Sequence, residues 1–445
     1  MVENAKVTVI EGQSLQLCVP DEAKISQQPS ASTPRPINVV FNGVNGQNMP
    51  DSFTLSENLL SRHLLLVGGI GSGKTNTFNH IMRSLSSQLK QNDVMIVFDT
   101  KGDFYKEFYR PGDVVISNDK TACGSAGIDY WNVVNEIADD EHLEENAAEI
   151  ASTLFAERLK SGSDPFFLNA AKDIVTVALY HFVKMRGTLK CDNALFSDFF
   201  RSASQQDLVD LLCMYPQFEA MKSYIPVNAP EQALGVMAEI QQVIRSVFVG
   251  NFSKSGTMSI RNLVKNKGGR RIFIEYDIGV GATLSPVYTL LFDLAIKEAL
   301  SRAKTDGNVF FAVDEFKLLP NLKHIDDAVN FGRSLGIKFM IGIQNTDQIV
   351  EAYNENMAKN IFSGFLNQFA FKVNDFSTRK YIKERAGENR KKTVFKTTAV
   401  HESIESANVI EDWDVSSLKL GQAIVMLNGA EPFLFRFREY IPQKP

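Results

Sequence analysis

The stretch that decides the fold is Gly68–Thr75, which reads Gly-Gly-Ile-Gly-Ser-Gly-Lys-Thr. It directly follows the apolar run His63–Val67 and directly precedes a segment with helical character. Glycines let backbone N–H groups turn toward phosphate oxygens, and the positive end of the next helix adds to that attraction. Lys74 can reach the β- and γ-phosphates, and Thr75 can ligate Mg²⁺. A glycine-rich turn without nucleotide chemistry would not need this strand and helix context, so we expect a P-loop ATPase.

The residues expected to hold the nucleotide form one continuous stretch. Phosphate-binding loops work largely through backbone N–H groups, so the whole loop and the first turn of the next helix are assigned. The expected ligand is ATP with Mg²⁺. The assigned residues are Gly68, Gly69, Ile70, Gly71, Ser72, Gly73, Lys74, Thr75 and Asn76.

Length and composition indicate a globular protein. The chain has 445 residues, of which 44% are hydrophobic and 22% charged, enough to bury one large core or two. Its cysteines, Cys18, Cys123, Cys191 and Cys213, form no Cys-x-x-Cys pair, so neither a zinc site nor a disulfide framework is predicted. The net charge of −5 argues against a uniformly basic DNA-coating surface. It leaves open a local basic groove or a pore within an oligomer.

Signals for export and membrane insertion are weak. No signal peptide opens the chain, and the longest apolar stretches, such as Ile174–Val183, fall well below the roughly 18 residues that span a bilayer. We therefore expect a cytoplasmic protein with no direct membrane span.

The order of apolar runs predicts an α/β fold. From Ile37 onward, short β-like runs alternate with helix-length segments, which is typical of a mostly parallel sheet flanked by helices. Near the end, two runs flank Asn428-Gly429, a strong signal for a carboxy-terminal β-hairpin. The predicted parallel strands are His63–Val67, Val94–Asp99, Asp113–Ser117, Arg271–Asp277, Val309–Asp314, Ile337–Ile343 and Asn367–Val373, and the predicted hairpin strands are Gln422–Leu427 and Phe433–Arg438.

The same patterns divide the chain into four parts. Residues 1–36 are expected to be a peripheral β segment and linker, because Lys6–Val19 alternates like a short strand pair and Ser26–Pro36 is rich in Ser, Gln and Pro. Residues 37–138 and 263–445 form the two parts of the ATPase domain. Residues 139–262 form an inserted all-helical domain, because the β-like runs stop there. Its predicted helices are Asn146–Ala156, Phe166–Val183, Gln205–Met214 and Gln232–Val247.

Two strand ends offer an acidic partner for Mg²⁺. Val94–Asp99 and Val309–Asp314 both end in aspartate, but only the second is followed by glutamate. We assign Asp314 to the Mg²⁺ shell and Glu315 to accepting a proton from the attacking water, which hydrolysis requires and binding does not. For Asp99 two interpretations stay open: a direct role at the nucleotide, or capping of the turn that follows its strand.

Two further residues lie where a motor ATPase would use them. Gln344 ends the apolar run Ile337–Ile343, so we expect it to sense the γ-phosphate or to orient the water; the alternative is a strand-end amide that satisfies backbone groups. Arg333 lies between two predicted strands and could serve a neighbouring subunit's nucleotide as an arginine finger. An isolated loop arginine is more often a solvated charge, and spacing alone leaves that alternative open.

The succession of these motifs resembles the type IV secretion coupling proteins, conjugative DNA-translocating ATPases of the FtsK–HerA class. The resemblance covers roughly residues 55–390 with order and spacing intact, which is far more specific than a P-loop. The motifs that carry it are Leu65–Thr75, Phe98–Phe104, Val313–Phe316, Gly332–Gly336, the isolated Gln344, the run Asp164-Pro-Phe-Phe, and Lys372–Thr378 with Ala386-Gly387 after it.

The resemblance implies a RecA-like motor that assembles as a homo-hexameric ring and passes single- or double-stranded DNA through its channel. It also implies that the helical insertion helps to recruit substrate, that Gln344 senses the γ-phosphate and that Arg333 acts in trans. Typical members carry amino-terminal transmembrane helices, which this sequence lacks, and many have Asp-Pro-Lys-Gly-Glu where it has Asp99-Thr-Lys-Gly-Asp103. Relaxase or secretion-channel proteins are therefore expected partners, and any placement at the inner membrane would be peripheral, through such partners.

The sequence gives only weak signals about what the ATPase moves. The densest basic stretches, Lys380–Lys396 and Lys265–Arg271, suit sequence-independent phosphate contacts, but a solvated charged surface is the favoured interpretation of both. Three functions stay open: a DNA-pumping motor, a coupling ATPase whose cargo is protein, and a nucleotide-gated scaffold for a partner enzyme. The intact Glu315 disfavours the scaffold, and stimulation of hydrolysis by DNA separates the first function from the others.

Overall fold

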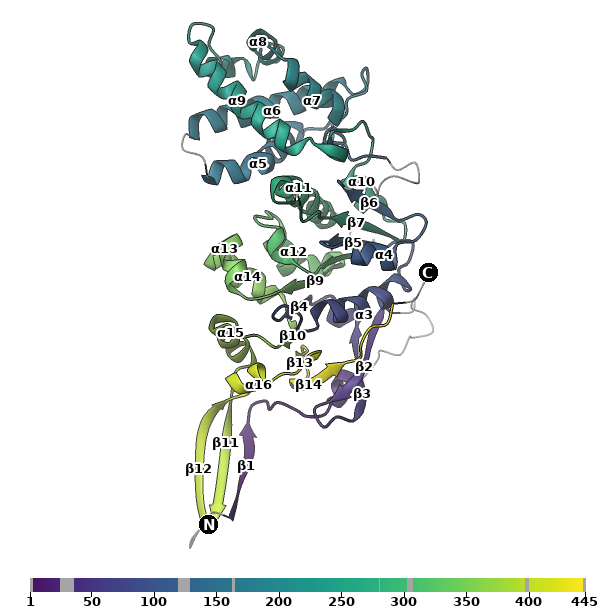
Figure 1. Ribbon diagram of the computed structural model, residues 1–445, viewed down its shortest axis with the longest axis vertical. Helices are drawn as coiled ribbons and strands as arrows, with labels where there is room; N and C mark the ends of the chain where they lie inside the picture. The colour runs from purple at the N-terminus through teal and green to yellow at the C-terminus, as the bar shows by residue number, and fades with distance from the viewer. Residues whose placement is uncertain are drawn as a thin grey trace.

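The computed structural model describes residues 3–24, 36–118, 129–161, 165–279, 281–301, 307–396 and 400–442. Within these residues the chain forms an 11-stranded sheet in the order β3-β2-β14-β13-β10-β4-β9-β8-β5-β7-β6 and a separate three-stranded sheet in the order β1-β11-β12. Figure 1 shows three stacked regions: helices at one end, the large sheet with its flanking helices in the middle, and the small sheet at the other end.

The large sheet is parallel from β10 to β6 and antiparallel from β10 to β3. The predicted α/β class with a mostly parallel sheet and a carboxy-terminal hairpin is therefore confirmed. Its strands are β2 (Asn38–Asn45), β3 (Pro50–Ser56), β4 (Leu64–Val67), β5 (Val94–Asp99), β6 (Val114–Ser117), β7 (Arg270–Glu275), β8 (Val309–Val313), β9 (Ile337–Ile343), β10 (Asn367–Phe371), β13 (Gln422–Met426) and β14 (Phe433–Phe437).

Helices cover both faces of this sheet, which explains why its parallel strands are apolar at successive positions. In β4, Leu64 and Leu66 pack in one core cluster with α3 and α4, while Leu65 and Val67 pack in the other with α11 and α12. The helices around the sheet are α1 (Asp21–Lys24), α2 (Glu57–Leu60), α3 (Lys74–Ser86), α4 (Asp103–Phe108), α10 (Ile260–Asn266), α11 (Gly281–Leu300), α12 (Ile325–Phe331), α13 (Asp347–Tyr353), α14 (Glu355–Gly364), α15 (Phe376–Ala386) and α16 (Asp412–Ser416).

A helical region lies between β6 and β7 in the chain and at one end of the molecule (Figure 1). We call it the helical insertion; it consists of α5 (Leu143–Ser161), α6 (Pro165–Met185), α7 (Asn193–Ser202), α8 (Gln205–Cys213) and α9 (Pro230–Val247). The chain enters and leaves it side by side, because Asn132 N–H donates to Met258 O at 2.8 Å and Met258 N–H donates to Tyr130 O at 3.0 Å. The division of the chain at residues 138 and 262 stays a prediction.

One helix in the described part of the chain is long and apolar enough for a membrane span. This helix is α6, and 61% of its most apolar window is buried within the fold. It packs against α5, α8 and α9. The short apolar stretch Ile174–Val183 lies within this longer helix, because polar residues such as Asn169, Lys172 and Asp173 interrupt the apolar runs without ending the helix.

The amino-terminal residues that the structure describes are peripheral only in part, and the division of the chain at residue 36 stays a prediction. Val19 and Ala23 are buried in the core, and Gln16 forms a β-bridge with Phe433. The predicted strand pair within Lys6–Val19 was wrong, since β1 (Glu3–Glu11) pairs with β11 instead. Local alternation cannot identify a partner that lies hundreds of residues away. The predicted linker Ser26–Pro36 lies, apart from Pro36, outside the described residues.

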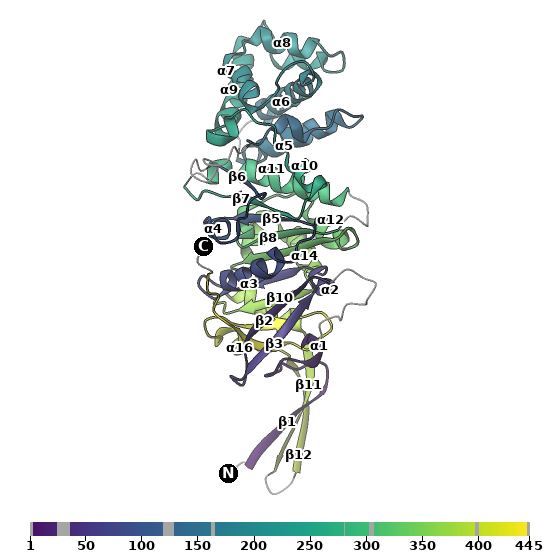
Figure 2. The same ribbon diagram turned by 90° about the vertical axis from the view of Figure 1, so that its right-hand side faces the viewer.

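The three-stranded sheet, which we call the stalk sheet, consists of β1, β11 (Glu388–Lys396) and β12 (Val400–Asn408). It extends away from the large sheet in both views (Figures 1 and 2). The hairpin β11–β12 was not predicted, because the many charged residues of β11 indicate only a basic stretch. Its antiparallel register runs without interruption from Glu388 opposite Asn408 to Lys396 opposite Val400.

Candidate nucleotide site

The predicted site residues come from three neighbouring strands. β4, β9 and β8 lie side by side and parallel, so their carboxyl ends meet at one edge of the sheet. The phosphate loop follows β4, Gln344 follows β9, and Asp314 with Glu315 follows β8. This order explains how residues far apart in the sequence converge on one place.

The phosphate loop has a shape that side chains larger than glycine would disturb. Gly71 and Gly73 adopt φ values of 71° and 118°, a region that suits glycine. A Cβ on Gly68 would lie 2.6 Å from Ser72 Oγ. Ser72 Oγ is buried with no hydrogen-bond partner among the described residues. A phosphate group fits this cradle, since it would accept from the backbone N–H groups and from Ser72.

Lys74 lies inside the loop at the start of α3. Its ammonium group donates to Gly68 O at 2.5 Å and to Gly69 O at 3.2 Å. Burial lowers the pKa of Lys74, and the negative charges of Asp314 and Glu315 oppose that shift. The loop thus holds a cation against its own carbonyl oxygens, from which it can turn to a phosphate.

Thr75 and Asp314 form the candidate Mg²⁺ site. The Thr75 hydroxyl donates to Asp314 Oδ2 at 2.7 Å. Asp314 is 7% exposed, and its Oδ1 is buried without a hydrogen-bond partner in the part of the chain that the structure describes. Burial raises the pKa of Asp314, while the Thr75 hydrogen bond and the charge of Lys74 lower it. A hydroxyl and a carboxylate oxygen are ligands that Mg²⁺ accepts, so the residues present fit this ion.

Glu315 and Gln344 form a pair beside this site. Gln344 Nε2 lies 3.0 Å from each carboxylate oxygen of Glu315, and both side chains are half-buried. The amide therefore fixes the orientation of the carboxylate. A role of Gln344 in sensing the γ-phosphate stays a prediction.

A pocket of about 880 Å³ opens beside the phosphate loop. Its walls are Gly69–Ser72, Gln344 with Asn345, the loop 372–375 after β10 and the loop 417–420 before β13. The last two walls were not predicted as site residues. The loop 372–375 could have been found, because it follows a predicted strand at the same sheet edge. The loop 417–420 carries no such signal; it is held in place by the hydrogen bond from Gly421 N–H to Ser72 O at 3.0 Å.

Two lysines near the site were also missed. Lys101 and Lys317 lie close enough to Lys74 for their positive charges to contribute to lowering its pKa. Lys101 belongs to the turn after β5, the strand that ends in Asp99. The Asp99 carboxylate accepts from the backbone N–H groups of Tyr105 at 2.8 Å and Lys101 at 3.3 Å. These bonds support the interpretation of Asp99 as a capping residue for the turn.

Arg333 and Asn76 stand apart from the other predicted residues. Arg333 precedes β9, at the opposite end of that strand from Gln344, and donates to Asn58 Oδ1 at 3.3 Å. A strand of this length spans about 20 Å, so Arg333 cannot reach the phosphate loop of its own chain. The Asn76 side chain bonds to the backbone of Arg438 and Tyr440, which leaves only its N–H at the first turn of α3 for a phosphate.

Comparison with known proteins identifies relatives for most of the chain. Residues 51–437 match the family model described as the type IV secretion-system coupling protein DNA-binding domain. The coupling protein TraD of Escherichia coli (strain K12) is 24% identical over 329 residues, 70% of this chain and 41% of TraD. VirD4 of Bartonella henselae is 24% identical over 288 residues, 58% of this chain and 43% of VirD4. The chain thus spans about two fifths of the length of these relatives.

Solved structures show the same fold over nearly the whole chain. The conjugative coupling protein TrwBΔN70 has a TM-score of 0.75 at 17% identity, covering 98% of this chain and 95% of TrwBΔN70. TrwB in complex with ADP and Mg²⁺ has a TM-score of 0.72 at 16% identity, covering 99% of this chain and 96% of that structure. TrwB has also been solved with the non-hydrolysable analogues ADPNP and GDPNP. With its RecA-like fold and a family match over residues 51–437, the chain belongs to the type IV secretion-system coupling protein family.

Proposed function

We propose that this protein is an ATPase that uses Mg²⁺-dependent hydrolysis to drive DNA, or a DNA–protein complex, through a ring of identical subunits. The observation that carries the enzymatic part is the Glu315–Gln344 pair beside Lys74, Thr75 and Asp314. A carboxylate held at that position can take a proton from water, which a site built only for binding does not need.

Each side chain has a distinct task in this proposal. Lys74 holds the β- and γ-phosphates, Thr75 and Asp314 hold Mg²⁺, and Glu315 activates the water. Bound Mg²⁺ would neutralise charge on the phosphate oxygens. The TrwB complexes with ADP–Mg²⁺ and with ADPNP support ATP and Mg²⁺ as the ligands here, because the fold is shared and the fitting residues are present.

Arg333 is proposed to act on the nucleotide of a neighbouring subunit. Its position at the amino edge of the sheet removes it from its own phosphate loop, and its side chain is exposed. The exposed side chain of Phe331 lies close by in the sequence, on the same connection. A second subunit that packs its phosphate-loop edge against this surface would receive the guanidinium group, as arginine fingers require.

DNA is the favoured cargo because the matching family model is that of a DNA-binding domain. The basic stretch Lys380–Lys396 is partly neutralised within the chain. Several of its cations already face carboxylates of the same chain, as in Lys383–Asp412, Arg390–Glu11 and Lys392–Glu402. We therefore expect DNA contacts in the channel of the assembled ring, where weak contacts repeat around the axis.

Steady-state ATP hydrolysis, with and without single- and double-stranded DNA at low and moderate salt, tests the function. Lys74→Ala serves as the blank, and chelation of Mg²⁺ should abolish activity. Salt-sensitive stimulation by DNA supports the nucleic-acid motor. Lys74-dependent hydrolysis that ignores DNA would favour a protein cargo, and no Lys74-dependent hydrolysis would leave only a scaffold.

Mixing two inactive variants tests the role of Arg333. Arg333→Ala should bind ATP normally but lose turnover, since only transition-state charge stabilisation is removed. A mixture with Glu315→Gln should recover part of the activity, because some interfaces then combine an intact Glu315 with an intact Arg333. Mixtures as inactive as their components would contradict action in trans.

A further inference from the structure

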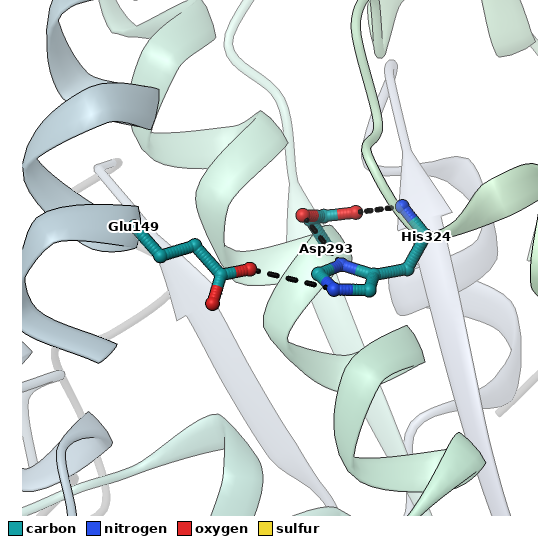
Figure 3. A group of neighbouring side chains, drawn as sticks. All are labelled: Glu149, Asp293 and His324. Atoms are coloured by element: carbon teal, nitrogen blue, oxygen red, sulfur yellow. Dashed lines mark hydrogen bonds and ion pairs between the residues drawn. The ribbon is translucent and has the colours of Figure 1, made fainter. Parts of the chain in front are cut away.

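A cluster of ionisable side chains joins the helical insertion to the ATPase core. Figure 3 shows Glu149 from α5, Asp293 from α11 and His324, which directly precedes α12. His324 Nδ1 lies 3.0 Å from Asp293 Oδ2, and the His324 N–H donates to Asp293 Oδ1 at 3.0 Å. On its other side, His324 Nε2 lies 3.4 Å from Glu149 Oε1. The imidazole ring therefore bridges two carboxylates from different parts of the fold.

The ligand atoms of these three residues lie within 4.8 Å of one another, so a metal ion is one interpretation. The neighbouring contacts favour an ion-pair network instead. Lys297 Nζ contacts Glu149 Oε2 and also donates to Asn146 Oδ1 at 3.0 Å. Both oxygens of Asp293 already accept from His324. With Lys297 and a protonated His324, the two carboxylates are neutralised without a metal.

Glu315 and His324 lie at the two ends of one segment, residues 315–324. Between them the chain is fixed by buried contacts: Phe316 stacks on Tyr353 with ring centroids 5.5 Å apart, and the Tyr353 hydroxyl donates to Leu319 O. Leu319 and Leu322 are fully or almost fully buried. A packed segment of this kind passes a displacement at one end to the other more readily than a solvated loop does.

The insertion holds this segment through more than the imidazole. Lys323 Nζ donates to the backbone carbonyl of Glu149 at 3.3 Å, so two consecutive residues contact one residue of α5. Asp293 is only 3% exposed, which makes an unpaired charge there costly. A movement of α5 would therefore move the segment 315–324 or break these contacts.

We propose that His324 is a positioning residue that, bridged between Glu149 and Asp293, couples the helical insertion to Glu315 and so makes ATP turnover depend on the position of the insertion. This inference rests on the proposed ATPase function. His324 is not among the residues that line the pocket beside the phosphate loop, so it acts through Glu315. A cargo or partner that shifts α5 would alter turnover through this contact.

The bridge is sensitive to pH. Burial lowers the pKa of His324, but the hydrogen bond and charge of Asp293 and the charge of Glu149 outweigh it and leave the pKa raised from 6.5. Lys297 opposes this shift, and Lys323 is a further cation beside the cluster. Because the folded pKa lies above the unfolded value, the charged bridge is complete below pH 6.5 and is lost as pH rises through the folded value. Coupling should weaken over that interval.

The test compares wild type, His324→Gln, Glu149→Gln and the double variant by kcat and KM for ATP from about pH 6 to about pH 9. Each single variant should lower kcat by about 5-fold or more at the acidic end and leave KM within about 2-fold. The double variant should be no worse than either single variant, because both break one connection. Wild-type kcat should fall as pH rises through the folded pKa of His324, and this fall should be absent from His324→Gln.

A second measurement separates positioning from loss of structure. Amide hydrogen exchange in α5 is recorded with and without ADP–Mg²⁺; wild type should show a nucleotide-dependent change that His324→Gln lacks. Lys184→Gln, which breaks the exposed Lys184–Asp139 ion pair elsewhere in the insertion, is the matched control and should behave as wild type. Unchanged kcat and unchanged exchange in His324→Gln and Glu149→Gln would overturn the inference.

The two proposals can fail separately. Wild type that hydrolyses ATP through Lys74, with His324→Gln indistinguishable from it at every pH, removes only the coupling role. Wild type without Lys74-dependent hydrolysis removes the ATPase function and the coupling role that rests on it.

Discussion

The large sheet and the stalk sheet are built from the same backbone hydrogen bonds but differ in what covers them. In the large sheet, Phe41, Phe53 and Ile341 are at most 1% exposed. In the stalk sheet, Val7 is 56% exposed and Ile404 is 54% exposed. A three-stranded sheet without a hydrophobic face is marginal on its own, so the stalk depends on its attachment to the core. Function and stability should therefore both depend on the large sheet and little on the stalk.

The largest expected effect is on ATP hydrolysis, which should depend on the large sheet and not on the stalk sheet. Lys74→Ala, at the carboxyl edge of the large sheet, should lower ATP hydrolysis by about 100-fold or more, because it removes a direct phosphate contact. Replacing residues 388–408 with a short linker should leave basal hydrolysis within about 2-fold of wild type. The linker can be short, since Val409 N–H donates to Gly387 O at 3.0 Å.

Both variants are measured by phosphate release at saturating ATP, with circular dichroism as the control for folding. A loss of basal hydrolysis on removing the stalk would contradict the expectation that the nucleotide site functions without the stalk sheet. It would mean that the stalk sheet contributes to assembly of the active ring.

Two isoleucine substitutions, one in each sheet, test how much each sheet contributes to the free energy of unfolding. Ile341→Ala in β9 removes a fully buried side chain and should cost about 2–5 kcal/mol of unfolding free energy. Ile404→Ala in β12 should stay within about 0.5 kcal/mol, because that side chain is already half-exposed. Denaturant unfolding followed by fluorescence measures both. Equal losses would indicate that the stalk is covered in solution, most simply by another subunit.

An effect smaller than that of Ile341→Ala is expected where the two sheets join. Asn389 is 4% exposed, and its side-chain amide donates to Gln13 O at 2.8 Å, just after β1. Asn389→Ala should cost about 1 kcal/mol, the usual net contribution of one hydrogen bond. The cost should be local, so amide exchange should quicken in β1 while exchange in β4 and β9 stays unchanged. Faster exchange throughout would show that the stalk root supports the core.

The site residues that could be predicted from the sequence share one property: each follows a strand of the parallel sheet. In a parallel sheet the carboxyl ends of neighbouring strands share an edge, so the residues after three predicted strands were expected to meet, and Lys74, Thr75, Asp314, Glu315 and Gln344 do meet. Loop 417–420 obeys no such rule. It reaches the site from an antiparallel part of the sheet, through a contact between Gly421 and the phosphate loop.

By itself, the sequence determined the elements whose signals are local. The phosphate loop, the parallel strands and the hairpin around Asn428-Gly429 depend on neighbouring residues, on glycine conformations and on apolar runs. Tertiary structure alone decided the long-range pairings: β1 with β11, Gln16 with Phe433, and Glu149 with His324. Such pairs form because the rest of the fold brings them together, and the energy of each is too small to leave a pattern in the residues on either side.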